Sequence, residues 1–485
     1  MTDIATSPTR SVRFGRLPSR GLLLGFSGIR VTCMAGSALV FVPSLLIGGF
    51  LGLLSTATVW VTLLGAAFTP WAGRPAAETA PTAAHFLTRR VKGQTTYAAR
   101  PGAPRPAGTL ALPGDAAALR WWEDTGSSAA MVHDPHERTL TAVAQVTHPA
   151  YVLLSPDEQA HRVHGWGRAL GGLASSGSCA RIQILETTQP DSGKGLHDWW
   201  ASHRSDGGSN WAVAQYDELM TTKAPAASTH RTLIAVSLDM KRAGKAVRDA
   251  GRGVKGAAAV LAQDMAAFES SLRAAELRLA RWLGPSELAG VLRSAYDPAG
   301  WDAVSGTEVG RDLSTAGPIA VEEHWDHLRH DTGYSAVLWI SEWPRIDVPP
   351  HFLHALVFAP GVRKTISVTA TPLSTAAALR DIRKAKVEYA TDSAQKARVG
   401  FIEDLADVQE LADVNERERA LIGGHADMKF TGLIAITAPT KDELDAAVGQ
   451  VQRAATQALC ETRLLVGQQA RAFATGALPL ARKVH

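Results

Sequence analysis

The hydrophobic and polar positions divide the chain into one long apolar stretch near the amino terminus and a remainder in which short apolar runs alternate with mixed segments. No Asp, Glu, Lys, Arg or His occurs from Val31 to Gly73, a run of 43 residues. As one helix this run would be about 64 Å long at 1.5 Å per residue, whereas a bilayer core is about 30 Å thick. The run therefore predicts two membrane-spanning helices joined by a turn.

The two spans are short, and their turn is expected at one of two places. The predicted spans are 31–48 and 53–69, and the candidate turns are the glycines Gly48, Gly49 and Gly52, or the pair Ser55-Thr56. A signal peptide fits poorly because its apolar core is only 7–15 residues long. A helical hairpin buried in a soluble core is the remaining alternative.

Basic residues flank the apolar run on both sides. They are Arg10, Arg13, Arg16, Arg20 and Arg30 before it, and Arg74, Arg89, Arg90 and Lys92 after it. Because cytoplasmic flanks carry an excess of Lys and Arg, both termini are expected in the cytoplasm, with the chain multi-pass in the inner or plasma membrane. Trp71 lies where an interfacial aromatic anchor is expected. The basic segment 10–30 either only sets this topology or also contacts anionic headgroups.

Beyond the apolar run, a segment rich in Pro, Ala, Gly and Thr predicts a linker over 74–108, with a short helix at His85–Lys92. Strand and helix patterns then alternate, which predicts an α+β unit of the ferredoxin-like kind over 109–300. Its expected strands are 129–133, 139–147, 180–186 and 231–238, and its expected helices are 155–175, 198–222 and 257–283. A capping box at Ser155 and Glu158 marks the start of the first helix.

The second half repeats this style over 301–485. Its expected strands are 334–340, 364–369, 429–437 and 463–466, with two helices in 375–422 and one from Thr440 to about Cys460. The later helix of 375–422 carries the apolar stripe Phe401, Leu405, Val408 and Leu411. The final GQQARAFATGALPL is expected to be a loop. The fold class is therefore α+β with an N-terminal transmembrane helical hairpin, divided into 1–30, 31–73, 74–108, 109–300 and 301–485.

Composition and charge narrow the class of protein. The formal charge is +4 over 485 residues, which is too small for a nucleic-acid coat over the whole surface. The cysteines Cys33, Cys179 and Cys460 are odd in number and widely spaced, so they predict neither a disulfide framework nor a zinc knuckle. This usage fits a reducing cytoplasm.

Motifs for nucleotide or acyl chemistry are missing. A phosphate-binding loop needs G-x-x-x-x-G-K-S/T, but Gly193-Lys194 and Gly244-Lys245 lack the upstream glycine and the following hydroxyl residue. The hydrolase pattern G-x-S-x-G is incomplete at Gly126–Ser128 and Gly207–Ser209. Cys179 is interpreted as a buried small hydrophobe. The sequence therefore predicts no nucleotide-binding domain, no catalytic residue and no cofactor.

Two charged clusters leave alternatives open. His324, His327 and His330 are spaced at i, i+3 and i+6, but a helix would turn His330 about 120° away from His324, so no metal site is predicted. The basic segment 241–255 holds six Lys and Arg residues. It is either a solvated loop or a contact for DNA phosphates or lipid headgroups.

A resemblance to a known family is carried by two stretches near the carboxy terminus, ERERALIGGHADMKFTGLIAITAPTKDELDAAVGQVQRAA and LLVGQQARAFATGALPL. They resemble the amino-terminal, non-ATPase region of the conjugation ATPase of type IV secretion systems. The hairpin resembles the PrgI-type membrane protein, and an actinobacterial family fuses both pieces. Residues 110–147, the segment HGWGRALGGLASSG and SAVLWISEWPR (Ser335–Arg345) are similar to that family's other hallmarks.

The resemblance implies a non-catalytic membrane subunit of a conjugative DNA-transfer apparatus, because the sequence ends where the ATPase would continue into its nucleotide-binding domain. The implied partners are the conjugation ATPase, channel subunits and the lipid bilayer, in a homo- or hetero-oligomer, with direct DNA contact left open. The helical stripe Leu444, Ala447, Val448 and Val451 is either a docking surface for that ATPase or packs on the sheet. A scaffold of a type VII secretion complex is the main alternative, and an enzyme using the histidine cluster is the third.

Overall fold

The structure, a computed structural model, describes residues 26–483 apart from several internal segments. These segments are 101, 103–106, 148–150, 191–193, 205–208, 224–227, 300–311, 345, 347, 400–404 and 423–425. Most of the predicted basic segment 1–30 and part of the stripe that begins at Phe401 therefore lie outside the described residues.

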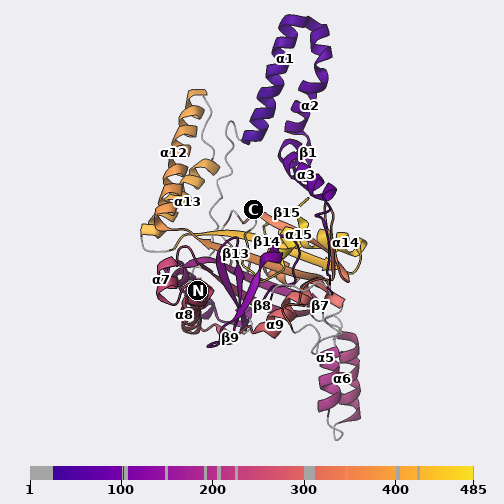
Figure 1. The fold of residues 1–485 in the computed structure, drawn as a ribbon, viewed down its shortest axis with the longest axis vertical. Helices are drawn as coiled ribbons and strands as arrows, with labels where there is room; N and C mark the ends of the chain where they lie inside the picture. Colours follow the sequence, from indigo (N-terminus) through magenta and orange to yellow (C-terminus); the bar gives the residue numbers. More distant parts are fainter. Residues whose placement is uncertain are drawn as a thin grey trace, which may run out of the picture.

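Two apolar helices, α1 (Gly28–Ser55) and α2 (Ala57–Phe68), form an antiparallel hairpin that projects from the body of the molecule (Figure 1). The chain reverses inside α1 at Gly49, whose φ of 54° and ψ of −144° are readily adopted by glycine alone. Ser37 Oγ donates to the Trp60 carbonyl at 2.9 Å, and Arg30 Nε donates to the Ala67 carbonyl at 3.0 Å. The turn thus lies at one of the two places expected from the sequence.

By length and composition, α1 is the one helix in the described part of the chain that could cross a membrane. The α2 helix is apolar but only 12 residues long. Large side chains of α1 point outward, with Leu46, Ile47 and Phe50 exposed to 78%, 89% and 77%. This exposure excludes the alternative of a hairpin buried in a soluble core.

The segment after the hairpin is structured over much of the predicted linker. It forms β1 (Pro70–Trp71), β2 (Arg74–Pro75), α3 (Ala76–Val91) and β3 (Thr96–Ala98). The alanines of α3 favour helix, and Ala77, Thr79 and Phe86 supply a buried face. Strand β3 pairs with β10 (Ala320–Glu323) at the edge of the main sheet. The chain is therefore tied to the sheet before residue 100.

The first half of the soluble part contains a β-α-β-β-α-β unit with strand order β9-β6-β8-β7. Its elements are β6 (Thr139–Thr147), α4 (Pro156–Ser175), β7 (Cys179–Pro190), β8 (Ser228–Asp239), α8 (Gly253–Ala274) and β9 (Arg278–Trp282). The capping box of Ser155 and Glu158 opens α4 as the sequence predicts. A helical pair, α5 (Lys194–His203) and α6 (Asn210–Lys223), is inserted between β7 and β8. This order is the ferredoxin-like arrangement predicted for the first unit.

The second half repeats the same order as β15-β12-β14-β13. Its elements are β12 (Gly333–Glu342), α11 (His354–Val357), β13 (Arg363–Pro372), β14 (Met428–Ala438), α14 (Lys441–Gln457) and β15 (Glu461–Leu464). Here too a helical pair, α12 (Thr375–Val399) and α13 (Leu405–Ile422), lies between the second and third strands. The two halves therefore share one topology, including the position of the inserted hairpin.

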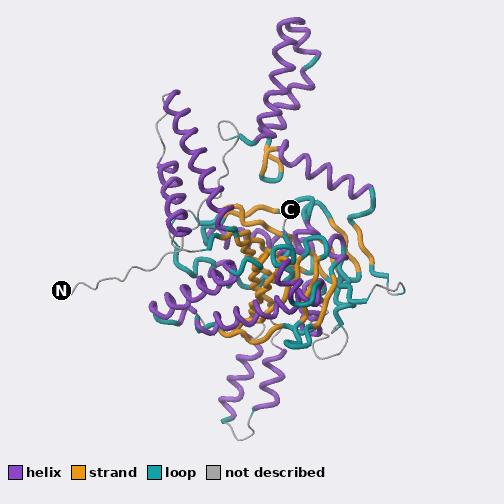
Figure 2. The backbone as a smooth tube through the Cα atoms, turned by 60° about the vertical axis from the view of Figure 1, so that its left-hand side comes forward, coloured by secondary structure: helices purple, strands orange, loops and turns teal. Residues whose placement is uncertain are grey.

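The two units meet through β7 and β13, which pair antiparallel with Ile184 opposite Val368. The result in the described residues is one sheet of 13 strands that runs through both predicted soluble domains. Its edges are extended by β4 (Arg120–Glu123), β5 (Ala130–Asp134), β10 and β11 (Leu328–His330). The smooth tube in Figure 2 shows this sheet at the centre, with helices around it.

Alternating residues of each strand face different cores. In β14, Ile434 and Ile436 belong to the core under α11 and α14, whereas Leu433 and Ala435 face the opposite side. On that opposite side, a core shared by both units is covered by α9 (Pro285–Tyr296), α15 (Gln469–Gly476) and the 3-10 turn η1 (Gly114–Ala118).

The carboxy-terminal stretch differs from its predicted loop. Residues 469–476 form α15, and Leu478, Leu480 and Ala481 are at most 4% exposed in the shared core. Eight residues carry too little periodicity to reveal a helix, and the burial depends on strands 300 residues away in the sequence. The loop prediction was therefore wrong for this segment.

Candidate functional site: the membrane hairpin and its junction with the sheet

An aromatic cluster joins the base of the hairpin to the sheet. Trp71, just after α2, stacks on Trp325 with ring centroids 5.5 Å apart, and Phe86 of α3 meets the same ring edge-on at 5.4 Å. Trp325 lies in the short loop between β10 and β11. Gly467 lies under this ring with φ of 71°, and a Cβ there would come within 2.6 Å of it. The backbone approaches so closely that only glycine fits.

A buried ion pair reinforces the junction. Arg89 of α3 binds the carboxylate of Glu323 in β10, whose side chain is only 1% exposed. The same carboxylate accepts a hydrogen bond from the Ala470 amide of α15 at 3.1 Å. Glu323 therefore ties three elements together, and one of them leads directly to the hairpin.

The hairpin is also fixed to α3 at its base. Ser27 Oγ donates to Glu78 Oε1 of α3 at 2.6 Å. The guanidinium of Arg30 lies 4.6 Å from the ring centre of Phe26 and 5.6 Å from that of Phe68. Through these contacts, α1, α2 and α3 form one continuous support between the apolar helices and the sheet.

The two inserted hairpins extend in opposite directions. In Figures 1 and 2, α12–α13 projects from the sheet to the same side as α1–α2, and α5–α6 projects to the other side. The α5–α6 hairpin displays Trp199, Trp211 and Tyr216, which are 54%, 73% and 50% exposed. Exposed Trp and Tyr are the side chains most often found at the centre of protein–protein contacts.

The histidine cluster weighed from the sequence does not come together as a metal site. His324 and His327 stack on each other at 4.4 Å in the turn between β10 and β11, but His330 lies buried in β11. Within the described ranges, no group of three His, Cys, Asp or Glu side chains could hold a metal ion.

His330 instead belongs to a buried polar network. Its Nδ1 lies 2.6 Å from the Tyr296 carbonyl and its Nε2 lies 2.7 Å from Ser335 Oγ, which in turn lies 2.7 Å from Thr437 Oγ1. The carbonyl requires a proton on Nδ1, so neutral His330 accepts from Ser335 through Nε2. Burial lowers the pKa of His330 to about 4.

This pKa predicts acid sensitivity of the fold. The unfolded chain takes up the proton near pH 6.5 and the folded protein only near pH 4, so stability is full above pH 6.5 and is lost as the pH falls toward 4. From pH 7.5 to pH 5, His330 should account for a loss of about 2 kcal/mol in the free energy of unfolding. Chemical unfolding of the detergent-solubilised chain at both pH values measures it. H330N should flatten this dependence, whereas H324N, at a half-exposed position in the turn, should leave it intact. Equal pH dependence in both variants would contradict the assignment.

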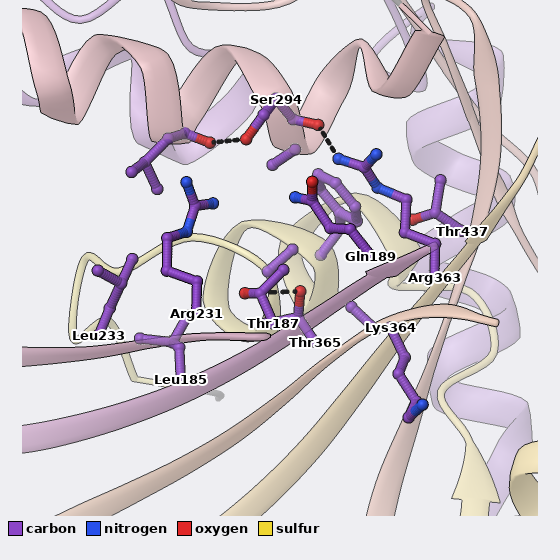
Figure 3. A pocket seen from close by; sticks show the side chains of 15 residues that line it. Leu185, Thr187, Gln189, Arg231, Leu233, Ser294, Arg363, Lys364, Thr365 and Thr437 are labelled. Carbon is purple, nitrogen blue, oxygen red and sulfur yellow. Dashed lines mark hydrogen bonds between the residues drawn. The ribbon is translucent and has the colours of Figure 1, made fainter. Parts of the chain in front are cut away.

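A small cavity lies where the two units meet beneath α9 (Figure 3). Arg231 and Arg363 point toward the end of α9, where Arg363 donates to the Ser294 carbonyl at 2.6 Å, and Lys364 points away. The cavity of about 20 Å³ has room for one water, which could satisfy the buried Arg231 Nε that has no partner among the described atoms. Ligand pockets are more than tenfold larger. The cavity therefore fits a structural water.

Cys179 and the basic segment 241–255 are the remaining candidates from the sequence. Cys179 is 3% exposed, and burial raises the pKa of its thiol to about 12, so it is protonated at neutral pH. Lys245 and Arg248 of the basic segment lie on a short helix, α7 (Gly244–Asp249), and are exposed.

The candidate docking stripe of α14 packs on the sheet. Leu444 and Val451 are fully buried, and Ala447 and Val448 lie against the same core. Of the two interpretations, packing on the sheet is therefore confirmed.

Comparison with known families gives one finding for this chain. A family described as "Putative type VII ESX secretion system translocon, EccE" matches residues 226–340. This stretch runs from the start of β8 into β12 and includes Trp325 and Glu323 of the junction. A search of curated proteins gave no match. The family match indicates a membrane component of a secretion system and lends no support to the conjugative, type IV resemblance.

Proposed function

We propose that the chain is a non-catalytic, membrane-anchored scaffold subunit of a type VII-like secretion complex. The observation that carries the proposal is the match of residues 226–340, because this stretch supplies the part of the sheet to which the membrane hairpin is fixed. The proposed partners are other membrane subunits and the ATPase of the same complex.

The membrane topology is part of this proposal. The two arms of the hairpin, 28–48 and 50–68, are both proposed to cross the bilayer, with both termini in the cytoplasm, since basic residues flank the apolar run on each side. The hydrogen bonds of two hydroxyl side chains support this arrangement, because Ser37 donates to the Trp60 carbonyl and Thr56 to the Gly52 carbonyl within the hairpin.

The conjugative alternative rests on the sequence resemblance of the carboxy-terminal stretch. Two inexpensive observations separate it from the proposal. Neighbouring genes for WXG-type secreted proteins would favour the type VII assignment, whereas a conjugation ATPase and a relaxase would favour the type IV one.

Affinity purification tests the proposal directly. The full-length chain, tagged at its carboxy terminus and extracted from native membranes in mild detergent, should co-purify with the membrane subunits and ATPase of a type VII system. The full chain is required because β3 belongs to the sheet, so a fragment beginning after residue 98 would lack an edge strand. Recovery of a conjugation ATPase in their place, above an untagged control, would overturn the assignment.

A further inference from the structure

We propose that the outward face of α12 binds anionic lipid headgroups of the membrane that the α1–α2 hairpin enters. The inference rests on the membrane anchoring in the proposed function and adds a second contact of the same chain with the bilayer. Its starting observation is that α12–α13 projects from the sheet to the same side as α1–α2 in both views (Figures 1 and 2).

The outward face of α12 is basic. It is formed by positions spaced three or four apart, as one face of a helix requires. Its exposed members are Arg380, Arg383, Lys384, Val387, Thr391, Ala394 and Arg398. This stripe carries four positive charges and no carboxylate, with small and apolar side chains between its basic ends. Such a face complements an anionic surface that also accepts apolar contact.

Several acidic side chains at the hairpin are paired with basic ones. Glu418 of α13 binds Lys386 at 2.5 Å, and Asp427, directly before β14, binds Arg417 of α13 at 2.5 Å. On α12 itself, Glu388 lies 3.7 Å from Lys384. Glu388 therefore partly compensates the charge of Lys384, and Asp381 is exposed beside the stripe, whereas Arg380, Arg383 and Arg398 of the stripe are exposed to solvent.

The equivalent hairpin of the first unit provides an internal comparison. The α5–α6 pair occupies the same place in the topology but extends away from α1–α2, and its exposed face presents Trp199, Trp211 and Tyr216. The inserted hairpin that points toward the membrane side presents the basic stripe of α12, whereas the one that points away presents exposed aromatic side chains. This difference favours lipid as the occupant of the α12 face.

Fluorescence quenching in vesicles tests the inference on the full-length chain. In a C33S background, a dye is attached to a single cysteine introduced by T391C, and the protein is reconstituted with headgroup-nitroxide lipid. Cys179 and Cys460 are buried and should not react. Quenching is expected in phosphatidylcholine mixed with phosphatidylglycerol, and it should weaken in phosphatidylcholine alone or at high salt. The combined substitutions R380Q, R383Q and R398Q should reduce quenching to the level of a matched Y216C label on α5–α6.

A third label separates this inference from the proposed function. A dye at L46C should be quenched by acyl-chain nitroxide if the hairpin is inserted. If L46C is quenched and T391C is not, the hairpin is inserted but α12 does not contact the lipid. Equal quenching of T391C in both lipid mixtures and in the neutralised variant would likewise contradict the α12 contact and leave the membrane anchor unaffected. If L46C is not quenched, the anchor fails and the inference falls with it. The salt titration uses unsubstituted arginines, so it gives an answer even if the neutralised variant folds poorly.

Discussion

Replacing Arg89 by Met is expected to lower the free energy of unfolding by about 3–5 kcal/mol, because the substitution leaves the buried carboxylate of Glu323 without its countercharge. The Ala470 amide would remain as a donor, but one neutral hydrogen bond does not replace a guanidinium. Since Glu323 joins α3, β10 and α15, the loss should loosen the support of the membrane hairpin before the rest of the sheet unfolds.

Thermal unfolding in detergent measures the loss of stability. Limited chymotrypsin cleavage near Tyr97 measures the loosening of the support of the hairpin. R90M is the matched control, because Arg90 is the exposed neighbour on the same helix. The double substitution R89M with E323Q removes the uncompensated charge and should recover part of the stability. If R89M and R90M unfold alike, the ion pair does not hold the junction.

The sequence predicted the elements whose pattern is local. The run from Val31 to Gly73 predicts an apolar hairpin because it contains no charged residue and is about twice as long as one membrane-spanning helix needs. The capping box at Ser155 and the helix start at Thr440 also follow from neighbouring residues, and both side chains accept a hydrogen bond from a backbone amide. These features need no partner from elsewhere in the chain.

The features that the sequence could not predict depend on distant contacts. Nothing near Ile184 or Val368 indicates that β7 and β13 will pair and merge two units into one sheet. The Pro- and Ala-rich composition of 74–108 is typical of a linker, yet α3 is ordered by Trp325 and Glu323, more than 230 residues away. The junction therefore became visible only in the fold.

The surroundings of the histidine cluster and of the basic stripe on α12 also depend on the tertiary structure. The spacing of His324, His327 and His330 is that of a helix face only in part, and the chain instead forms a turn and a strand there. His330 points inward from β11 and is buried, whereas His324 lies in the turn and is partly exposed. The basic stripe of α12 was present in the sequence as ordinary helical charge. The proposed lipid contact of this stripe depends on its direction relative to the membrane hairpin, and that direction is a property of the tertiary structure.

Replacing Gln183 by Leu should cost about 4 kcal/mol or more, because this side chain fastens the carboxy-terminal segment under the seam between the two units. Gln183 is fully buried in β7, and its Nε2 donates to Ser367 Oγ of β13 at 2.9 Å and to the Thr475 carbonyl at 2.7 Å. Its Oε1 accepts from the Ala481 amide at 2.7 Å. Leu fills similar volume but leaves these polar groups buried without partners, at about 1–3 kcal/mol each.

The same substitution on an exposed helix isolates the effect of these bonds. Gln452 lies exposed on α14, so Q452L should change the free energy of unfolding by less than about 0.5 kcal/mol. Chemical unfolding measures both variants, and hydrogen exchange of the Ala481 amide should become faster in Q183L alone. Because Arg181 Nε also donates to the Ala481 carbonyl at 2.7 Å, the segment keeps one attachment and the chain can still fold. Unchanged exchange at Ala481 in Q183L would contradict the prediction. The hydrophobic contacts of Leu478 and Leu480 would then hold the carboxy-terminal segment without the hydrogen bonds of the Gln183 side chain.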